Sequence, residues 1–423
     1  MEYIDTLWEK YESSEEREKK KKEKQLDDKR WAIVSIASIP LVMTLGNSML
    51  IPILPTMEKE LDITSFQSSL IITVYSVVAI LFIPIAGYLS DRLGRKKVII
   101  PSLLLTAIGG AIAAFSSWQM QSGYWLVLIG RTLQGVGAAG AFPIVLPLVG
   151  DMFRSKEKVS SSLGIIETAN TLGKVLSPIL GSLLASIIWF LPFVTIPIFC
   201  TISIFMMIFL VKSPKKKDTP NFREFLTKTK TLYKYNNRWL NSIFIIGGIL
   251  MFILFGVQFY LSSVLESQYQ VGNIKKGFLL AIPLGALCLA SFIAGKRIKE
   301  KKKLMKWITF IGVLLLAASV VLLSFFENLW VNIGIFVFGC IGIGIGLPCL
   351  DSLITDGIEE ESRGTITSIY SSMRFIGVAF GPPIVAILMK NLNTFMFYFL
   401  GGLAILCAIV CLYGIRPEKE ATS

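Results

Sequence analysis

Residues 87–97 read GYLSDRLGRKK and form a short hydrophilic turn between two long apolar runs. The run that leads into the turn, Ile63–Ser90, has 28 residues without a charge, and the run that follows, Val98–Gly130, has 33. A helix needs about 20 mainly apolar residues to cross a bilayer. The turn itself carries one carboxylate and four cations. This stretch therefore places the chain in a membrane, with a charged turn at the membrane surface.

The composition of the whole chain agrees with a membrane protein. Of its 423 residues, 53% are hydrophobic and 17% are charged, and the mean hydropathy is +0.64. Soluble globular domains carry about 25% charged residues, and disordered chains combine low hydrophobicity with high net charge. Both classes are excluded, so the remaining question is how many times the chain crosses the bilayer.

The uncharged runs predict an all-α polytopic membrane protein with twelve transmembrane helices. Two of the runs are long enough for two spans each, because a polar patch (Ser116–Gly123) and a kink-prone segment (Ile187–Pro192) divide them. The first six spans come from Trp31–Met57, Ile63–Ser90, Val98–Gly150 and Val159–Val211. The last six are Trp239–Leu265, Gly277–Gly295, Trp307–Phe326, Asn328–Leu350, Gly364–Met389 and Asn391–Ile415.

The positions of Lys and Arg predict the orientation. With twelve spans, 35 of the 42 Lys and Arg residues fall on the side of both termini, four on the other side and three inside spans. Cytoplasmic loops of membrane proteins carry the excess of Lys and Arg. We therefore expect both termini in the cytoplasm. The net charge of +13 is then a sign of membrane topology, and no nucleic-acid partner is needed to explain it.

The chain divides into two halves joined by a basic linker. We expect a cytoplasmic N-terminal tail (1–30), a six-helix half (31–211), a cytoplasmic linker (212–238), a second six-helix half (239–415) and a C-terminal tail (416–423). The tail is hydrophilic and carries no secretory signal; it is either solvated or attached to the membrane surface. Pro143, Asp151, Gly173 and Pro178 recur as Pro348, Asp356, Gly377 and Pro382 at offsets of 204–205, which indicates pseudo-symmetric halves.

The turn at 87–97 resembles the signature between the second and third helices of the major facilitator superfamily. Two further motifs support the resemblance. Arg131-Thr132-Leu133-Gln134-Gly135 is similar to the family's motif in the fourth helix. Gly173, Pro178 and Gly181 match the antiporter motif of the fifth helix, although Ser177 and Ser182 replace two of its usual residues and Lys174 lies within it. The resemblance covers residues 31–415 and implies the twelve-helix group of drug:proton antiporters.

By this resemblance the turn is a cytoplasmic gate. Asp91 would pair with the start of the eleventh helix near Thr365 and Thr367, where a carboxylate is favoured by the helix dipole. The other residues of the gate motif would be Gly87, Arg92, Gly94, Arg95 and Lys96. The alternative is a turn whose cations only fix the topology.

Five charges fall inside the predicted spans: Arg131, Glu167, Lys174, Asp351 and Arg374. A charge at the bilayer centre costs about 2.5–3.5 kcal/mol on insertion scales, so such residues usually face a cavity and pair. The resemblance places all four of their helices around a central cavity. Glu167 is our first candidate for the residue that couples proton movement to transport, and Asp351 is the second. The alternative is a static set of ion pairs that holds the helices together.

The predicted cavity has three cations against two carboxylates, which favours anionic, zwitterionic or neutral substrates. The first span has no acid and offers only Asn47 as a polar residue. In the seventh span Phe255 could line a substrate pocket and Gln258 could contact the substrate, although such aromatics often only pack. Glu266, at the outer end of that span, could serve an outward gate.

These features predict a secondary transporter that exports amphipathic small molecules or drugs in exchange for protons by alternating access. The alternative is a dedicated exporter or flippase of one anionic metabolite or lipid, for example a siderophore. A polytopic enzyme is remote, because the chain has no histidine, no nucleophile with a base and no phosphate-binding loop. A non-transporting sensor is also remote, because a sensor would not need the charges that are retained inside the spans. We expect a monomer in a bacterial plasma membrane, with the proton gradient as its energy source and no cofactor or metal.

Overall fold

The computed structural model describes residues 30–119, 123–153, 156–212, 237–298, 302–357, 360–391 and 393–415. The predicted N-terminal tail, most of the linker and the C-terminal tail lie outside these residues. The described part of the chain is helical throughout, which confirms the expected fold class. Helices suit a bilayer because every backbone polar group inside the hydrocarbon must find its hydrogen bond within the segment.

The first group of helices begins with residues 30–48 and the short segments η1 (Ile51–Ile53) and α2 (Leu54–Glu60). It continues with α3 (Ser65–Leu93), α4 (Arg95–Gln119), α5 (Tyr124–Ala141), α6 (Val145–Met152), α7 (Lys156–Ile187) and α8 (Leu191–Leu210). The second group comprises α10 (Asn237–Ser267), α11 (Asn273–Ile298), α12 (Lys302–Leu322), α13 (Leu329–Gly357), α14 (Glu360–Asn391) and α15 (Asn393–Gly414). We call these groups the first bundle and the second bundle.

Local sequence sets the ends of the helices around the quoted turn. Thr64 caps the start of α3, because its hydroxyl accepts a hydrogen bond from the Gln67 backbone N–H and the Gln67 side chain accepts one from Thr64 N–H. Gly94 ends α3 with a φ of +105°, a conformation that side chains rarely adopt. The glycine of the motif is thus required by the sharp turn that starts α4 at Arg95.

Eleven helical stretches in the described residues are long and apolar enough to cross a membrane. One of them joins α5 to α6 (Tyr124–Met152), and another joins residues 30–48 to η1 and α2 (Arg30–Glu60). The remaining long helix, α7, has 32 residues, enough to span, but polar side chains such as Glu167 and Lys174 lower its hydropathy. With α7 counted, the structure has the twelve long helices that the sequence predicts.

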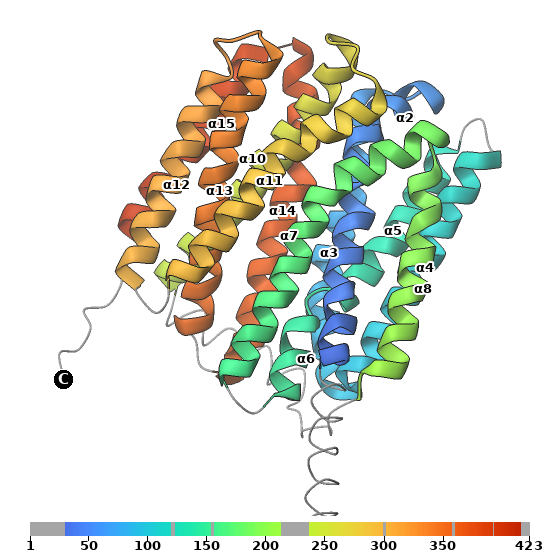
Figure 1. The fold of residues 1–423 in the computed structure, drawn as a ribbon, viewed down its shortest axis with the longest axis vertical. Helices are drawn as coiled ribbons and strands as arrows, with labels where there is room; N and C mark the ends of the chain where they lie inside the picture. The colour runs from blue at the N-terminus through green and yellow to red at the C-terminus, as the bar shows by residue number, and fades with distance from the viewer. Residues whose placement is uncertain are drawn as a thin grey trace, which may run out of the picture.

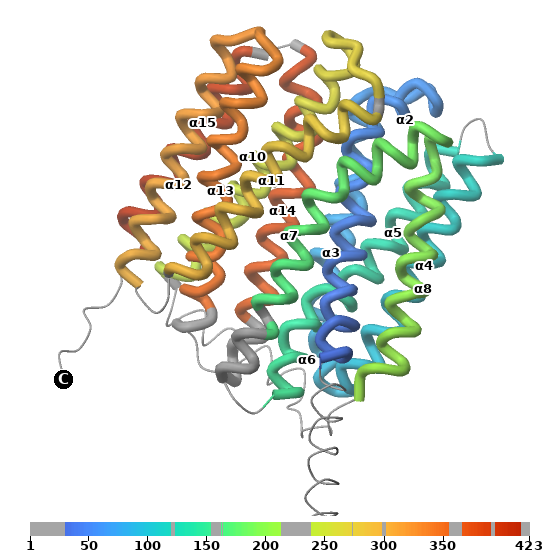
Figure 2. The backbone as a smooth tube through the Cα atoms, viewed as in Figure 1, coloured from blue at the N-terminus to red at the C-terminus, as the bar shows by residue number. Residues whose placement is uncertain are grey.

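The two bundles stand side by side, and their helices run along a common direction (Figure 1). We call the end at the bottom of Figure 1, where residue 30 lies, the lower end, and the end that carries α2 the upper end. Between the bundles, α3 packs on α14 and α7 packs on α11. The backbone trace in Figure 2 shows α7 and α11 converging toward the upper end.

The same close helix contact occurs in each bundle. Gly109 of α4 faces the backbone of Gly130 in α5, and Gly312 of α12 faces Gly342 in α13. At each of these four glycines an added Cβ would collide with the backbone carbonyl of the opposite glycine. Small residues let membrane helices approach this closely, where van der Waals contact holds them together.

Each bundle also contains a lysine that caps the end of its last helix. Lys96 Nζ donates to the carbonyls of Ile208 (2.9 Å) and Val211 (2.7 Å) at the end of α8. Lys306 Nζ of α12 donates to the carbonyl of Leu412 (2.7 Å) near the end of α15. The last carbonyls of a helix have no partner within it, so a nearby lysine satisfies them and interacts favourably with the helix dipole. The equivalent helices of each bundle are therefore joined in the same way.

Two glycines of α13 allow a matched test of the packing. Gly342→Ala should destabilise the protein by about 1–3 kcal/mol, because the new methyl group overpacks the contact with Gly312. Gly334→Ala is the control, since no atom lies within 4 Å of its added Cβ. Thermal unfolding of both variants in detergent should show a lower Tm only for Gly342→Ala. Equal Tm values would contradict the assigned contact.

Candidate functional site

Four of the five predicted intramembrane charges gather between the two bundles. Glu167 and Lys174 lie on α7, Asp351 lies on α13 and Arg374 lies on α14. The Arg374 guanidinium is 3.6 Å from the Asp351 carboxylate and lies over the Tyr370 ring, 5.5 Å from its centroid. Lys174 is close enough to interact electrostatically with the other three charges. We call these four residues the central cluster.

Glu167 is held by neutral groups. The side-chain amide of Asn170, one turn further along α7, donates to both carboxylate oxygens at 3.1 and 3.3 Å. Asn170 in turn accepts a hydrogen bond of 2.6 Å from Thr44 in the first helix. Sequence reasoning missed Asn170, although its spacing of three from Glu167 puts both side chains on one helix face. Through this chain of contacts the carboxylate is oriented by two helices.

Lys174 differs from the other members of the cluster. Its side chain is buried, with a relative exposure of 8%, and its Nζ has no hydrogen-bond partner among the described residues. Its charged neighbours include Asp351 and Arg374 of the second bundle, so the side chain reaches toward the contact between the bundles. The cluster as a whole carries two cations and two carboxylates.

Arg131 lies apart from the central cluster, contrary to the expectation that all five charges meet. Its guanidinium is fully buried and donates to the Ile71 carbonyl (2.9 Å), the Gln134 amide oxygen (2.6 Å) and Asn47 Oδ1 (2.5 Å). It also sits over the Tyr75 ring, 4.5 Å from the centroid. Arg131 therefore ties α5 to α3 and to the first helix. The same contacts place Asn47 beside Arg131.

The residues of the turn at 87–97 pair within the first bundle. Asp91 forms an ion pair with Arg95, and Arg95 Nε also contacts the Asp151 carboxylate at 3.2 Å. Lys96 caps α8, while Arg92 is exposed and the Cα of Gly87 faces open space. The expected partner of Asp91 at the start of α14 involves the side chain of Thr365, which lies outside the described residues. The gate therefore stays a prediction.

The residues that resemble the antiporter motif bring α7 close to its neighbours. Gly173 packs against Thr44 and the Leu41 carbonyl, and a Cβ on Gly181 would collide with the Met49 carbonyl. On the other side, the Pro178 carbonyl of α7 faces Gly277 of α11. The small residues of this motif thus let α7 touch both the first helix and the second bundle. A helix in this position could move relative to either bundle.

An ion cluster joins the two bundles at the upper end. Glu266 of α10 accepts hydrogen bonds from Lys59 of α2 (2.7 Å) and from Lys276 of α11 (2.6 Å). Lys59 is mostly exposed, whereas Lys276 is fully buried. Nearby, the Ser262 hydroxyl of α10 donates to the Ile51 carbonyl of η1 at 3.0 Å. Glu266 thus pairs with two lysines that sequence reasoning did not connect to it, and its role in an outward gate stays a prediction.

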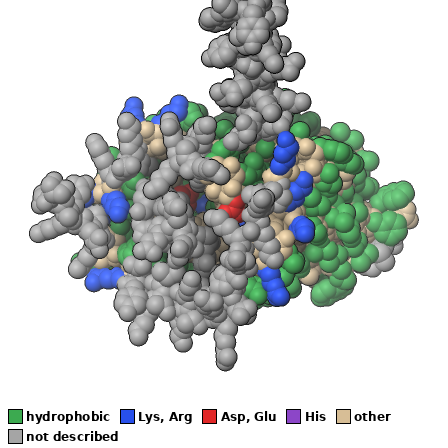
Figure 3. All heavy atoms as spheres, turned by 90° about the horizontal axis from the view of Figure 1, so that it is seen from below, with side chains coloured by type: hydrophobic (Ala, Val, Ile, Leu, Met, Phe, Trp, Pro, Cys, Tyr) green, Lys and Arg blue, Asp and Glu red, His purple; other side chains and the backbone are tan. Residues whose placement is uncertain are grey.

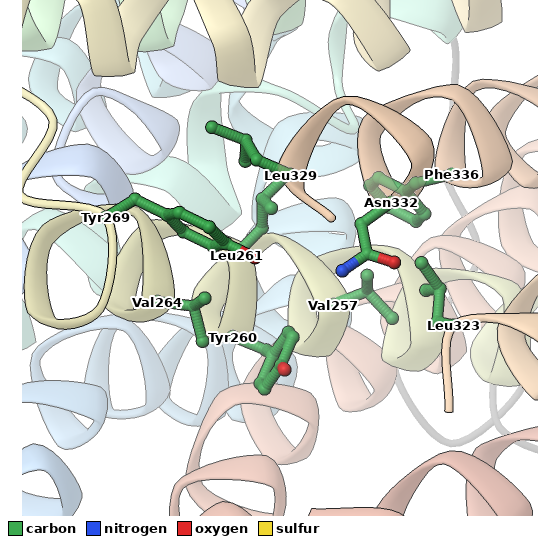
Figure 4. A pocket seen from close by; sticks show the side chains of 9 residues that line it. All are labelled: Val257, Tyr260, Leu261, Val264, Tyr269, Leu323, Leu329, Asn332 and Phe336. Atoms are coloured by element: carbon green, nitrogen blue, oxygen red, sulfur yellow. The ribbon is translucent and has the colours of Figure 1, made fainter. Parts of the chain in front are cut away.

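The predicted pocket residues of α10 are buried. Phe255 and Gln258 have relative exposures of 8% and 6%, and the Gln258 Nε2 has no hydrogen-bond partner among the described residues. A small apolar cleft lies further along α10 and is lined by Val257, Tyr260, Leu261, Val264, Tyr269, Leu323, Leu329, Asn332 and Phe336 (Figure 4). It has room for about one water molecule. This cleft is too small for a substrate, and Phe255 is not among its lining residues.

The central cluster is a group of charged side chains from three helices. In the described part of the chain, no three His, Cys, Asp or Glu side chains are placed to hold a metal ion. The charges of the central cluster can change their ion-pair partners, because each lies within reach of charges on a different helix.

Seen from the lower end, acidic side chains lie near the middle of the face, and Lys and Arg lie around them (Figure 3).

The upper ion cluster can be tested with graded substitutions. Glu266→Gln leaves the buried Lys276 without its anion, which should destabilise the closed upper end by about 3 kcal/mol. Lys59→Met removes only the exposed contact and should cost about 0–1 kcal/mol. With Ser262→Cys as the reporter in all samples, labelling by a membrane-impermeant maleimide should accelerate strongly with Glu266→Gln and little with Lys59→Met. Equal labelling rates for all three proteins would show that this cluster does not close the upper end.

Comparisons with known proteins agree with this fold. The model of the family described as "Major Facilitator Superfamily" matches residues 36–382. The chain is 56% identical to the bacillibactin exporter of Bacillus subtilis (strain 168), over 92% of this chain and 96% of the relative. It is 26% identical to the quinolone resistance protein NorA of Staphylococcus aureus (strain MRSA252), over 79% of this chain and 84% of that protein.

Two solved structures have the same overall architecture. The human organic anion transporter MFSD10 (TETRAN) superposes with a TM-score of 0.72 at 18% identity, over 90% of this chain and 99% of that one. A D-xylose-proton symporter superposes with a TM-score of 0.73 at 15% identity, over 91% and 98% of the two chains. At these identities the likeness concerns the fold alone. The family model and the 56% identical relative show that the chain is a membrane transporter, not an enzyme, and belongs to the major facilitator superfamily.

Proposed function

We propose that this transporter exports one anionic metabolite, a siderophore such as bacillibactin, across the bacterial plasma membrane. The observation that carries the proposal is the 56% identity to a bacillibactin exporter over nearly the full length of both chains. The relatives with multidrug or drug-resistance names share only about a quarter of their residues with this chain. A dedicated exporter is therefore better supported than broad drug efflux.

The central cluster supports an anionic cargo. Lys174 is a buried cation without a hydrogen-bond partner among the described residues. The second cation, Arg374, lies 3.6 Å from the Asp351 carboxylate. With Arg131 apart, the cluster is balanced at two cations and two carboxylates. When either carboxylate takes up a proton, the cluster gains a net positive charge, which attracts an anion.

We propose that the energy comes from the proton motive force. Electrostatics alone allows a proton and an anion to bind together, so exchange requires that the transporter reorients with only one of them bound. The membrane potential adds a direct contribution of about 2.3 kcal/mol per elementary charge at 100 mV, and an interior-negative potential drives anions outward. Proton exchange and the potential are thus separable parts of the driving force.

Glu167 remains the first candidate for the coupling residue. Its two oxygens accept hydrogen bonds from the neutral amide of Asn170, whereas Asp351 is paired with the cation Arg374. The direct hydrogen bonds of the Glu167 carboxylate are thus to a neutral group, whereas Asp351 lies in an ion pair. Asp351 is the second candidate.

The contacts between the bundles support alternating access. We place the lower end in the cytoplasm, since the basic segments of the chain lie there by sequence. In this orientation the Glu266 cluster closes the outer side of the transporter, and the central cluster is accessible from the cytoplasm. Export requires the outer ion pairs to part while the bundles rock about the central cluster.

The proposal is tested by transport in proteoliposomes that contain a pH-sensitive dye. Addition of bacillibactin should produce proton flux with the wild type, and Glu167→Gln should reduce that flux about tenfold or more, because it cannot carry the proton. Glu60→Gln removes an exposed carboxylate of α2 and is the matched control. An imposed potential without a pH gradient should still drive export by the wild type.

Other outcomes select other readings. Flux that survives Glu167→Gln and disappears with Asp351→Asn would move the coupling role to Asp351. Flux driven by quinolones and not by bacillibactin would replace the proposed substrate with drugs of the kind that NorA is named for. Bacillibactin transport that depends on the potential but moves no protons would eliminate antiport.

A further inference from the structure

Lys174 occupies an unusual position for a lysine inside a membrane. The side chain is more than nine-tenths buried on α7, and its Nζ donates no hydrogen bond among the described residues. A buried polar group without a partner costs about 1–3 kcal/mol, and a buried charge costs more. Such a group is expected where a ligand or a water molecule accepts its hydrogen bond during the transport cycle.

No neighbouring charge satisfies Lys174. Glu167 is seven residues away on the same helix, about 10 Å along the axis, and its oxygens are occupied by Asn170. Asp351 is engaged by Arg374. The remaining charged neighbour is the like-charged Arg374 of α14, and the other titratable neighbour is the Cys288 thiol of α11. Two cations from opposite bundles therefore face one region, and neither carboxylate of the cluster makes a direct hydrogen bond or ion pair with Lys174.

A second buried donor lies in the same place. The Tyr370 hydroxyl of α14 is buried beside Asp351 and interacts with its carboxylate. The Tyr370 ring also carries the Arg374 guanidinium on its face. The unsatisfied group here is thus the lysine ammonium, and the Tyr370 phenol is a second group of the cluster that can donate to oxygen.

We propose that Lys174 and Arg374 form a two-point site for an oxygen-rich anion, with one anionic oxygen on Lys174 and another on Arg374 and the Tyr370 hydroxyl. The chemical class is a chelator-like compound with several carboxylate or phenolate oxygens. A cationic drug is repelled by the ammonium, and a neutral drug offers it a hydrogen-bond acceptor without the charge. Because Lys174 and Arg374 belong to different bundles, the anion also joins the bundles at the point about which they rock. This inference rests on the proposed export of an anionic metabolite and specifies how the anion is held.

The test uses the purified full-length protein and two probe pairs, salicylate with salicylamide and phthalate with phthalamide. Each pair differs in anionic charge while the ring is kept. Ligand-induced shifts of the unfolding temperature, titrated with each probe, give apparent Kd values. The wild type should prefer each acid over its amide by about tenfold, equivalent to about 1.4 kcal/mol. Lys174→Met should abolish this preference, and Lys174→Arg should keep it.

Two controls separate binding from folding. Lys296→Met removes an exposed lysine of α11 and should leave the preference unchanged. Without probe, Lys174→Met should unfold at the same or a higher temperature than the wild type, because it removes an unpaired buried charge. A lowered unfolding temperature together with an unchanged preference would assign Lys174 a structural role and overturn the proposal.

The remaining outcomes also decide the question. Failure of both acids to bind the wild type, or equal binding to the wild type and Lys174→Met, would overturn the anion site. None of the four probes is a siderophore. An acid preference that depends on Lys174 would therefore support the anion site even with a negative bacillibactin assay. In the same way, bacillibactin export without an acid preference would keep the proposed function and eliminate this site.

Discussion

The cost of a charge inside hydrocarbon is the constraint on which the rest of this structure depends. Each intramembrane charge costs about 2.5–3.5 kcal/mol on insertion scales unless it finds partners or water. The chain meets this cost in two ways. Arg131 is satisfied by a carbonyl, two side-chain amides and a ring, all within the first bundle. The central cluster draws its charges from both bundles and leaves Lys174 without a hydrogen bond among the described residues, so its stability depends on how the bundles are placed.

This difference separates static from mobile parts of the molecule. Contacts within a bundle are repeated and close, as in the glycine pairs of α4 with α5 and of α12 with α13. Contacts between the bundles depend on ion pairs, single hydrogen bonds and the packing of α7 on α11. A rigid unit of tightly packed helices that meets its partner through exchangeable polar contacts is suited to rocking motion.

Much of the fold could be predicted from the sequence, because hydrocarbon thickness imposes a length and an apolar composition on every span. The helix ends at Gln119 and Tyr124 and at Ile187 and Leu191 fall where polar or kink-prone residues divide the runs. Within the first run, Pro52 and Pro55 coincide with a break into η1 and α2 that hydropathy alone does not reveal. The central cluster of four charges could also be predicted, because charged residues inside spans usually pair with one another.

The remaining features depend on three-dimensional neighbours. Arg131 finds backbone carbonyls of distant helices, and no sequence pattern identifies a carbonyl as a partner. Lys276 lies just before the predicted span Gly277–Gly295, but α11 begins at Asn273 and the helix carries this lysine into the contact with Glu266. Asn170 offered a signal in its spacing from Glu167, whereas the hydrogen bond from Thr44 required the packing of two helices.

The two lysines on Glu266 have a consequence for the environment outside the cell. Lys59 is largely exposed to solvent and Lys276 is not, although they share one carboxylate. Dissolved salt screens exposed charges over about 8–10 Å at physiological strength and leaves buried pairs almost unaffected. Salt should therefore weaken the Lys59–Glu266 contact and have little effect on the Lys276–Glu266 contact. In the orientation proposed above, salty surroundings would weaken the Lys59 contact with Glu266 and leave the Lys276 contact in place.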